Sequence, residues 1–104
     1  MTYTVVLSPE ASADLLGIYR YIAKAASPEI AQRFTDAIVN HCERFHQLPE
    51  RAARRDDIRP GLHITNYRGG VVPAFAIEAT TVSILGIFYG GRDYEILLLP
   101  DSDN

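Results

Sequence analysis

The sequence is poor in the residues that build disulfide frameworks and metal sites. It contains one cysteine, Cys42, and three histidines, so neither an intramolecular disulfide nor a cysteine-based zinc cluster can form. His41 and His46 are five positions apart in a segment with a helical pattern. Zinc ligation from one helix needs a spacing of about three or four. Both are therefore interpreted as ordinary helix histidines, and we expect no metal site and no cofactor.

Lysine and long hydrophobic runs are also scarce. Lys24 is the only lysine, and the net charge is −3, which argues against nucleic-acid binding over the whole surface. No segment reaches the roughly 18 apolar residues that a membrane helix requires, and the N-terminus has no basic stretch ahead of an apolar run. We therefore expect a soluble, unexported protein of the cytoplasm, without membrane contact.

Size and hydrophobic content are sufficient for one folded domain over residues 1–104. A chain of 104 residues buries roughly two thirds of its unfolded surface, and 47% hydrophobic residues is typical of globular proteins.

Basic side chains gather between residues 51 and 68, where five arginines accompany Asp56 and Asp57. This patch can contact phosphate or an acidic partner, or it can be a solvated loop.

The first half of the chain carries two helix starts of one kind, Ser8-Pro9-Glu10 and Ser27-Pro28-Glu29. Serine is a favoured N-cap and proline a favoured first helical residue. Apolar residues then recur every three or four positions, first at Ala11, Leu15, Ile18, Tyr19, Ile22 and Ala26, then at Ile30, Phe34, Ala37, Ile38, Cys42, Phe45 and Leu48. Since almost no linker separates the two segments, we predict a helical hairpin that ends at Pro49.

The other segments have strand patterns. Residues 2–7 form a short β-branched strand, and a polar loop covers residues 49–61. A strand beginning at Leu62 and a second strand, residues 71–79, are predicted to form a hairpin around Arg68-Gly69-Gly70. Pro73 indicates an edge strand or a bulge. Residues 81–89 are apolar on both alternations, which is typical of a central strand covered on both faces.

These elements predict an α+β fold of order β-α-α-β-β-β, with an antiparallel sheet and a helical hairpin packed on one face. Two helices cover only part of a four-stranded sheet. Some apolar surface of the central strand should therefore be left for a partner. Residues 92–100 fit either a helical turn or a short strand.

The ordered landmarks resemble the RelE/ParE toxin superfamily, and its ParE branch in particular. The matching stretches are YTVVLSPEASADLLGIYRYIA, SPEIAQRF, DDIRPGLHITNYRGG and IFYGGRDYE. The resemblance implies the growth-inhibiting toxin of a type II toxin–antitoxin pair, of the kind associated with plasmid stabilization. Its implied partner is a cognate antitoxin, ribbon-helix-helix and ParD-like, whose C-terminal segment wraps the toxin in a hetero-oligomer. ParE-like members poison DNA gyrase, whereas RelE-like members cut mRNA in the ribosomal A site.

The resemblance and the charge pattern together suggest the residues that contact the target: Arg59, His63, Tyr67, Arg68, Arg92, Asp93 and Tyr94. Metal-independent RNA cleavage needs a base, an acid and cations that converge on one phosphate, and these residue types could supply them. One lysine and a negative net charge suit ribosomal RNA poorly. Gyrase inhibition needs only a binding surface, so it is favoured over the endonuclease alternative, and no catalytic residue is assigned.

Four of these residues have competing interpretations. His63 stands where ParE-like members commonly carry a basic residue, so a titrating imidazole replaces a fixed charge. This departure leaves open an inactive module that only binds antitoxin. Arg59 could instead be a salt-bridge partner of Asp56 or Asp57. Arg92 and Asp93 could pair with each other or with the arginine-rich loop.

Overall fold

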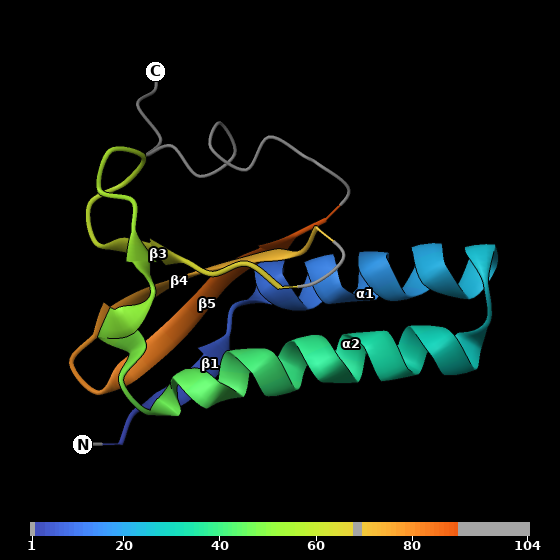
Figure 1. Ribbon diagram of the computed structural model, residues 1–104, viewed down its shortest axis with the longest axis horizontal. Coiled ribbons are helices and arrows are strands. Elements are labelled where there is room, and N and C mark those ends of the chain that lie inside the picture. The colour runs from blue at the N-terminus through green and yellow to red at the C-terminus, as the bar shows by residue number, and fades with distance from the viewer. Residues whose placement is uncertain (1, 68–69, 90–104) are drawn as a thin grey trace.

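A computed structural model of the chain describes residues 2–67 and 70–89. Two long helices lie side by side and antiparallel, next to a five-stranded sheet (Figure 1). The elements are β1 (Thr4–Leu7), α1 (Pro9–Ala25), α2 (Pro28–Glu43), β2 (Ala53–Arg54), β3 (Leu62–Ile64), β4 (Val72–Glu78) and β5 (Thr81–Phe88), with 3-10 turns at Arg44–His46 and Pro49–Arg51. The predicted α+β fold and helical hairpin are confirmed. No helix in these two ranges is long and apolar enough to cross a membrane.

Both predicted helix starts are confirmed. The Ser8 hydroxyl accepts a hydrogen bond from the Ala11 N–H at 3.0 Å, and the Ser27 hydroxyl accepts one from the Ile30 N–H at 3.1 Å. The second helix is shorter than predicted, because α2 ends at Glu43 and a 3-10 turn follows. This turn brings the His46 carbonyl to the Tyr3 N–H, 2.8 Å away, and so ties the end of the hairpin to the first strand.

The sheet has the order β1-β5-β4-β3-β2 and is mixed rather than wholly antiparallel. β1 pairs with β5 in parallel, whereas the other neighbouring strands pair antiparallel. Short connections force β3, β4 and β5 to alternate in direction. β1 and β5 are separated by most of the chain, so no turn fixes their relative direction. The two-residue strand β2 falls within the segment predicted to be a loop. A strand this short shows no alternation of polar and apolar residues, so the sequence did not predict it.

β5 is an inner strand, as predicted, with β1 on one side and β4 on the other. β4 is also an inner strand, so the edge interpretation of Pro73 is wrong and the bulge interpretation is confirmed. The register between β4 and β5 shifts next to this proline: Ala74 pairs with Gly86, whereas Phe75 pairs with Ile84. Leu85 is the extra residue of the bulge.

Apolar side chains pack on both faces of the sheet, as the pattern of residues 81–89 predicted. The main core joins β4 and β5 to the helices through residues that include Phe75, Val82, Ile84, Ala11, Ile18, Ile38 and Cys42. A second cluster contains Ile58, Leu62, Ile64, Ala74 and Phe88. Because neighbouring residues of a strand point to opposite faces, this second cluster lies on the face away from the helices.

Polar groups at the start of α1 complete the edge of β5 beyond the end of β1. The Ser8 N–H donates to the Ile84 carbonyl at 3.0 Å, and the Ser8 hydroxyl donates to the Leu85 carbonyl at 3.2 Å. The Ile87 N–H donates to the Asp14 carboxylate at 3.0 Å. These bonds satisfy backbone groups of β5 that β1 is too short to reach.

Candidate interaction surface

The arginine-rich loop uses two of its arginines in local ion pairs. The Arg54 guanidinium lies 3.0 Å from the Asp56 carboxylate, and the Arg55 guanidinium lies 2.9 Å from that of Asp57. Asp56 also accepts the Gly61 N–H at 2.8 Å. The Gly61 hydrogen bond, together with the Arg54 guanidinium, holds the pKa of Asp56 below its ordinary value. The hydrogen bond from Arg55 lowers the pKa of Asp57 in the same way.

Arg59 takes part in neither pair, so its interpretation as the salt-bridge partner of these aspartates is wrong. Within residues 2–67 and 70–89 the ion pairs join Arg54 to Asp56 and Arg55 to Asp57. Arg59 begins a turn in which its carbonyl accepts the Leu62 N–H at 3.0 Å. Pro60 and a left-handed Gly61, with φ of 79°, give this turn the pattern of type II. The turn leaves Arg59 exposed at the start of β3.

Arg59 lines a hollow of about 330 Å³ together with Pro60, Leu62, Ala76, Glu78, Ser83 and Leu85. Leu62 pairs with Ala76, Ala76 with Ser83, and Ser83 with Val6. Directly paired residues point to the same face of a sheet, so these four side chains form one row across β3, β4, β5 and β1. Leu62 belongs to the second apolar cluster, which places the row and the hollow on the face away from the helices.

His63 and Tyr67 lie on the other side of the sheet, toward the helices. His63 is 6% exposed and stacks on Phe75, with ring centroids 5.3 Å apart. Its Nδ1 atom has no hydrogen-bond partner among the described residues. Tyr67 is half-buried and contacts α2 through His41, at a centroid distance of 4.8 Å, and through Phe34. The sheet therefore separates Arg59 from these two candidates.

Two groups that could be reactive serve packing instead. His41 Nε2 lies 3.2 Å from the Thr65 hydroxyl, and burial, aided by the nearby Arg44 cation, lowers the pKa of His41. Burial also raises the pKa of the Cys42 thiol to about 11, so the thiol is protonated at neutral pH. No cluster of three or more metal-ligating side chains occurs in the part of the chain that the structure describes.

The remaining candidates, Arg68, Arg92, Asp93 and Tyr94, lie outside the described residues, as do residues 92–100 with their helix-or-strand alternative. The sequence-based candidates did not include Glu78, Ser83 or Leu85, which line the hollow with Arg59. Strand alternation could have placed Glu78 on the face of Ala76. The bulge at Leu85 breaks that alternation in β5, and no sequence signal marks its position.

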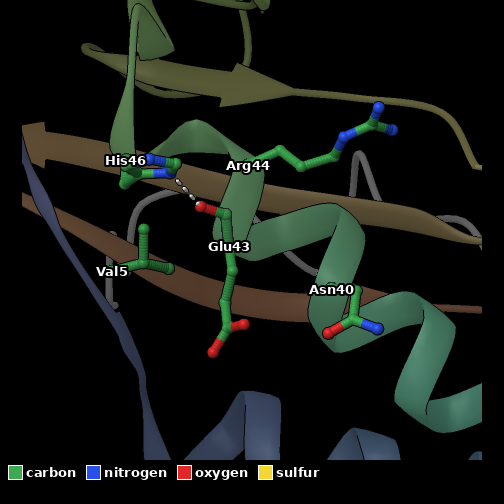
Figure 2. A pocket seen from close by; sticks show the side chains of 5 residues that line it. All are labelled: Val5, Asn40, Glu43, Arg44 and His46. Carbon is green, nitrogen blue, oxygen red and sulfur yellow. Dashed lines mark hydrogen bonds between the residues drawn. The ribbon is translucent and has the colours of Figure 1, made fainter.

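A second hollow, of about 400 Å³, lies between β1 and the end of α2 (Figure 2). Val5, Asn40, Glu43, Arg44 and His46 line it. The His46 Nδ1 atom lies 2.8 Å from the Glu43 backbone carbonyl. The side chains of Glu43 and Arg44 point in different directions (Figure 2). Their charges therefore do not converge on one ligand position.

Known proteins match this chain in both sequence and fold. A family model described as the ParE toxin of the type II toxin–antitoxin system, parDE, matches residues 5–94. The structure of a chromosomal ParDE toxin–antitoxin system from P. aeruginosa matches with a TM-score of 0.76 and 25% identity, covering 85% of this chain and 96% of that one. The toxin–antitoxin complex RelBE2 from Mycobacterium tuberculosis matches in fold, with a TM-score of 0.63, 22% identity and coverage of 88% and 95%. No curated protein sequence matches the chain.

Proposed function

Because this chain belongs to the ParE toxin family of type II toxin–antitoxin systems, we propose that it arrests growth by binding DNA gyrase and that a cognate antitoxin neutralises it. The observation that carries the proposal is the family match over residues 5–94. The likeness to a ParDE structure over most of both chains supports it. In this proposal the toxin acts in the cytoplasm, where its target is.

The arrangement of the candidate residues favours binding over RNA cleavage. Cleavage without a metal needs an acid, a base and cations around one phosphate. Among the described residues, Arg59 is on one face of the sheet, while His63 and Tyr67 pack toward the helices on the other. A net charge of −3 with one lysine also suits ribosomal RNA poorly. Neither observation hinders a binding function.

The proposed target contacts are Arg59 and Tyr67, together with the candidates outside the described ranges, Arg68, Arg92, Asp93 and Tyr94. His63 would have to leave its stack on Phe75 to reach a target. Arginine and tyrosine are common anchors of protein interfaces, which is why a poison that acts by contact can use them without any catalytic group.

The test is induction of the protein alone in a bacterial host, and then together with the product of the neighbouring reading frame. We expect growth arrest with an SOS response and filamentation, gyrase-linked DNA breaks in vitro, and recovery on co-expression. Cuts at codon positions in translated mRNA would instead identify the ribosome as the target. Normal growth with abundant folded protein would contradict growth inhibition altogether.

The neutralising partner is proposed to be a ribbon-helix-helix, ParD-like antitoxin that forms a hetero-oligomer with the toxin. Its C-terminal segment would lie across the sheet face opposite the helices, where the apolar second cluster and the hollow with Arg59 are found. Val6 on this face is 46% exposed, and exposed apolar surface commonly marks a partner site. Amide exchange with and without antitoxin tests the location, since protection should rise in β4 and β5.

A further inference from the structure

Two opposite charges face the same hollow without pairing. Arg59 and Glu78 are both exposed, and neither forms an ion pair within the two described ranges. The antiparallel register of Leu62 with Ala76 brings the start of β3 beside the end of β4. Arg59 therefore stands at the same end of the hollow as Glu78, and both line it. Each charge is available to a ligand.

Beside these charges the hollow is lined by apolar side chains and one hydroxyl. The apolar lining residues are Pro60, Leu62, Ala76 and Leu85, and Ser83 contributes the hydroxyl. The row continues past Ser83 to Val6 on β1, which is 46% exposed. A hollow of about 330 Å³ falls at the lower end of the range for pockets that enclose a small ligand. It is large enough to receive one bulky side chain of a partner.

This lining favours a peptide over a nucleic acid. A phosphate backbone presents only negative charge, and Glu78 would repel it next to the one arginine that could bind it. On the floor of the hollow, the side chains of Leu62, Ala76 and Leu85 offer a sugar–phosphate chain no hydrogen bond. A peptide can place a hydrophobic side chain on the floor and a carboxylate on Arg59, and such charge-assisted bonds are among the stronger ones in proteins.

Building on the neutralisation proposed above, we propose that this hollow anchors an acidic, apolar segment of the antitoxin. One large aliphatic or aromatic side chain packs on Leu62, Ala76 and Leu85. A carboxylate about two positions away in an extended peptide, or about three or four positions away in a helical one, lies on the same side as this side chain and pairs with Arg59. Glu78 excludes RNA and selects against a second acidic residue at its end of the hollow.

Selection from a random peptide library displayed on phage tests this chemistry with the purified, full-length protein. We expect enriched peptides to combine Leu, Ile, Phe or Met with a nearby Asp or Glu. Arg59→Glu should weaken binding of those peptides at least about tenfold and shift the selection toward basic residues. The matched control, Arg33→Glu, reverses an exposed charge on α2 and should change neither. Arg59→Gln provides a milder variant, and thermal unfolding verifies that all three fold.

Amide exchange with an enriched peptide locates the site. Protection should rise in β3, β4 and β5 and not around Val5 and residues 40–46, which line the second hollow. A short single-stranded RNA serves as the competing probe and should bind no better to wild type than to Arg59→Glu. Peptides without acidic residues, protection confined to the second hollow, or RNA binding that depends on Arg59 would each overturn the proposal. No enrichment at all would also overturn it. Growth arrest is scored separately, so loss of toxicity with peptide selection intact contradicts only the proposed function.

Discussion

At the scale of single residues, burial changes the chemistry that a residue type suggests. His41 belongs to a titratable residue type, yet its ring lies between Phe45 and Tyr67 at centroid distances of 5.7 and 4.8 Å. His63 is the one candidate whose role depends most on burial, since its ring stacks on Phe75 and its Nδ1 atom has no partner in the described ranges. Neither fact is visible from residue type or spacing.

His41 should make the protein less stable in mild acid. Its pKa in the folded protein is lowered by burial and by Arg44, whereas in the unfolded chain it is near about 6.5. The unfolded state therefore binds the proton more readily, so stability is complete above about pH 6.5 and falls as the pH drops below it. Between pH 7.5 and pH 5.5, the fall in thermal midpoint should be smaller for His41→Gln than for wild type. His46→Gln, at an exposed position, is the control, and identical pH slopes for wild type and His41→Gln would contradict the prediction.

At the scale of elements, helices and strands are joined by a few polar contacts whose effects can be separated by comparing matched positions. Ser8 and Ser27 have the same local sequence, Ser-Pro-Glu, and each hydroxyl accepts the cap hydrogen bond from the N–H three residues further on. Only Ser8 also contacts the sheet, through the Leu85 carbonyl. The start of α1 is thus part of the helix–sheet junction, whereas the start of α2 is a local cap.

Removal of the two caps should therefore have unequal effects. Ser27→Ala should lower the free energy of unfolding by about 1 kcal/mol, the usual effect of losing an N-cap. Ser8→Ala should lower it by about 2 kcal/mol, because the Leu85 carbonyl also loses its donor. Urea unfolding of both variants measures the difference. Equal losses would mean that the Leu85 contact contributes nothing.

Two glycines give a second matched comparison. A Cβ at Gly86 would lie 2.8 Å from Cζ of Phe88, a ring only 7% exposed, and 3.4 Å from the Asp14 carboxylate. Gly86→Ala should therefore lower the free energy of unfolding by about 1–3 kcal/mol. Gly17 has open space around its Cα in an exposed turn of α1, so Gly17→Ala should raise stability by up to about 1 kcal/mol. Chemical denaturation distinguishes the two signs, and a stabilised Gly86→Ala would show that the Phe88 ring moves aside easily.

At the scale of the whole molecule, the sheet divides the chain into two surfaces. The helices and their aromatic contacts cover one face, where His63 and Tyr67 pack. The other face carries the row from Leu62 to Val6 and the hollow with Arg59. If target and antitoxin both use this second face, neutralisation follows from simple competition for one surface.

That arrangement predicts unequal effects on toxicity for two exposed arginines. Arg59→Ala should weaken growth arrest more than Arg33→Ala, and both should keep a thermal midpoint close to wild type, since exposed substitutions usually change stability by within about 0.5 kcal/mol. Growth curves at matched protein levels provide the measurement. Equal toxicity of the two variants would remove Arg59 from the proposed target contacts while leaving its role in peptide binding open to the library test.

The sequence by itself determined the local structure. The caps at Ser8 and Ser27, the two amphipathic helices and the inner position of β5 all follow from interactions between residues close together in the chain, or from the alternation along one strand. These signals depend on residues that are close together in the sequence, so they can be recognised without knowing the fold. The same is true of the family resemblance, which depends on motifs in order.

Only the tertiary structure decided which distant groups meet. The parallel pairing of β1 with β5, the bulge at Leu85 and the burial of His63 depend on contacts between segments far apart in the chain. Within the arginine-rich loop, the composition was compatible with any pairing, and the folded turn assigned Asp56 to Arg54 and Asp57 to Arg55. Electrostatic and packing energies depend on distance in space, and the register of the sheet, absent from the local sequence, sets those distances. For that reason Arg59 and Glu78 line one hollow that the sequence did not reveal.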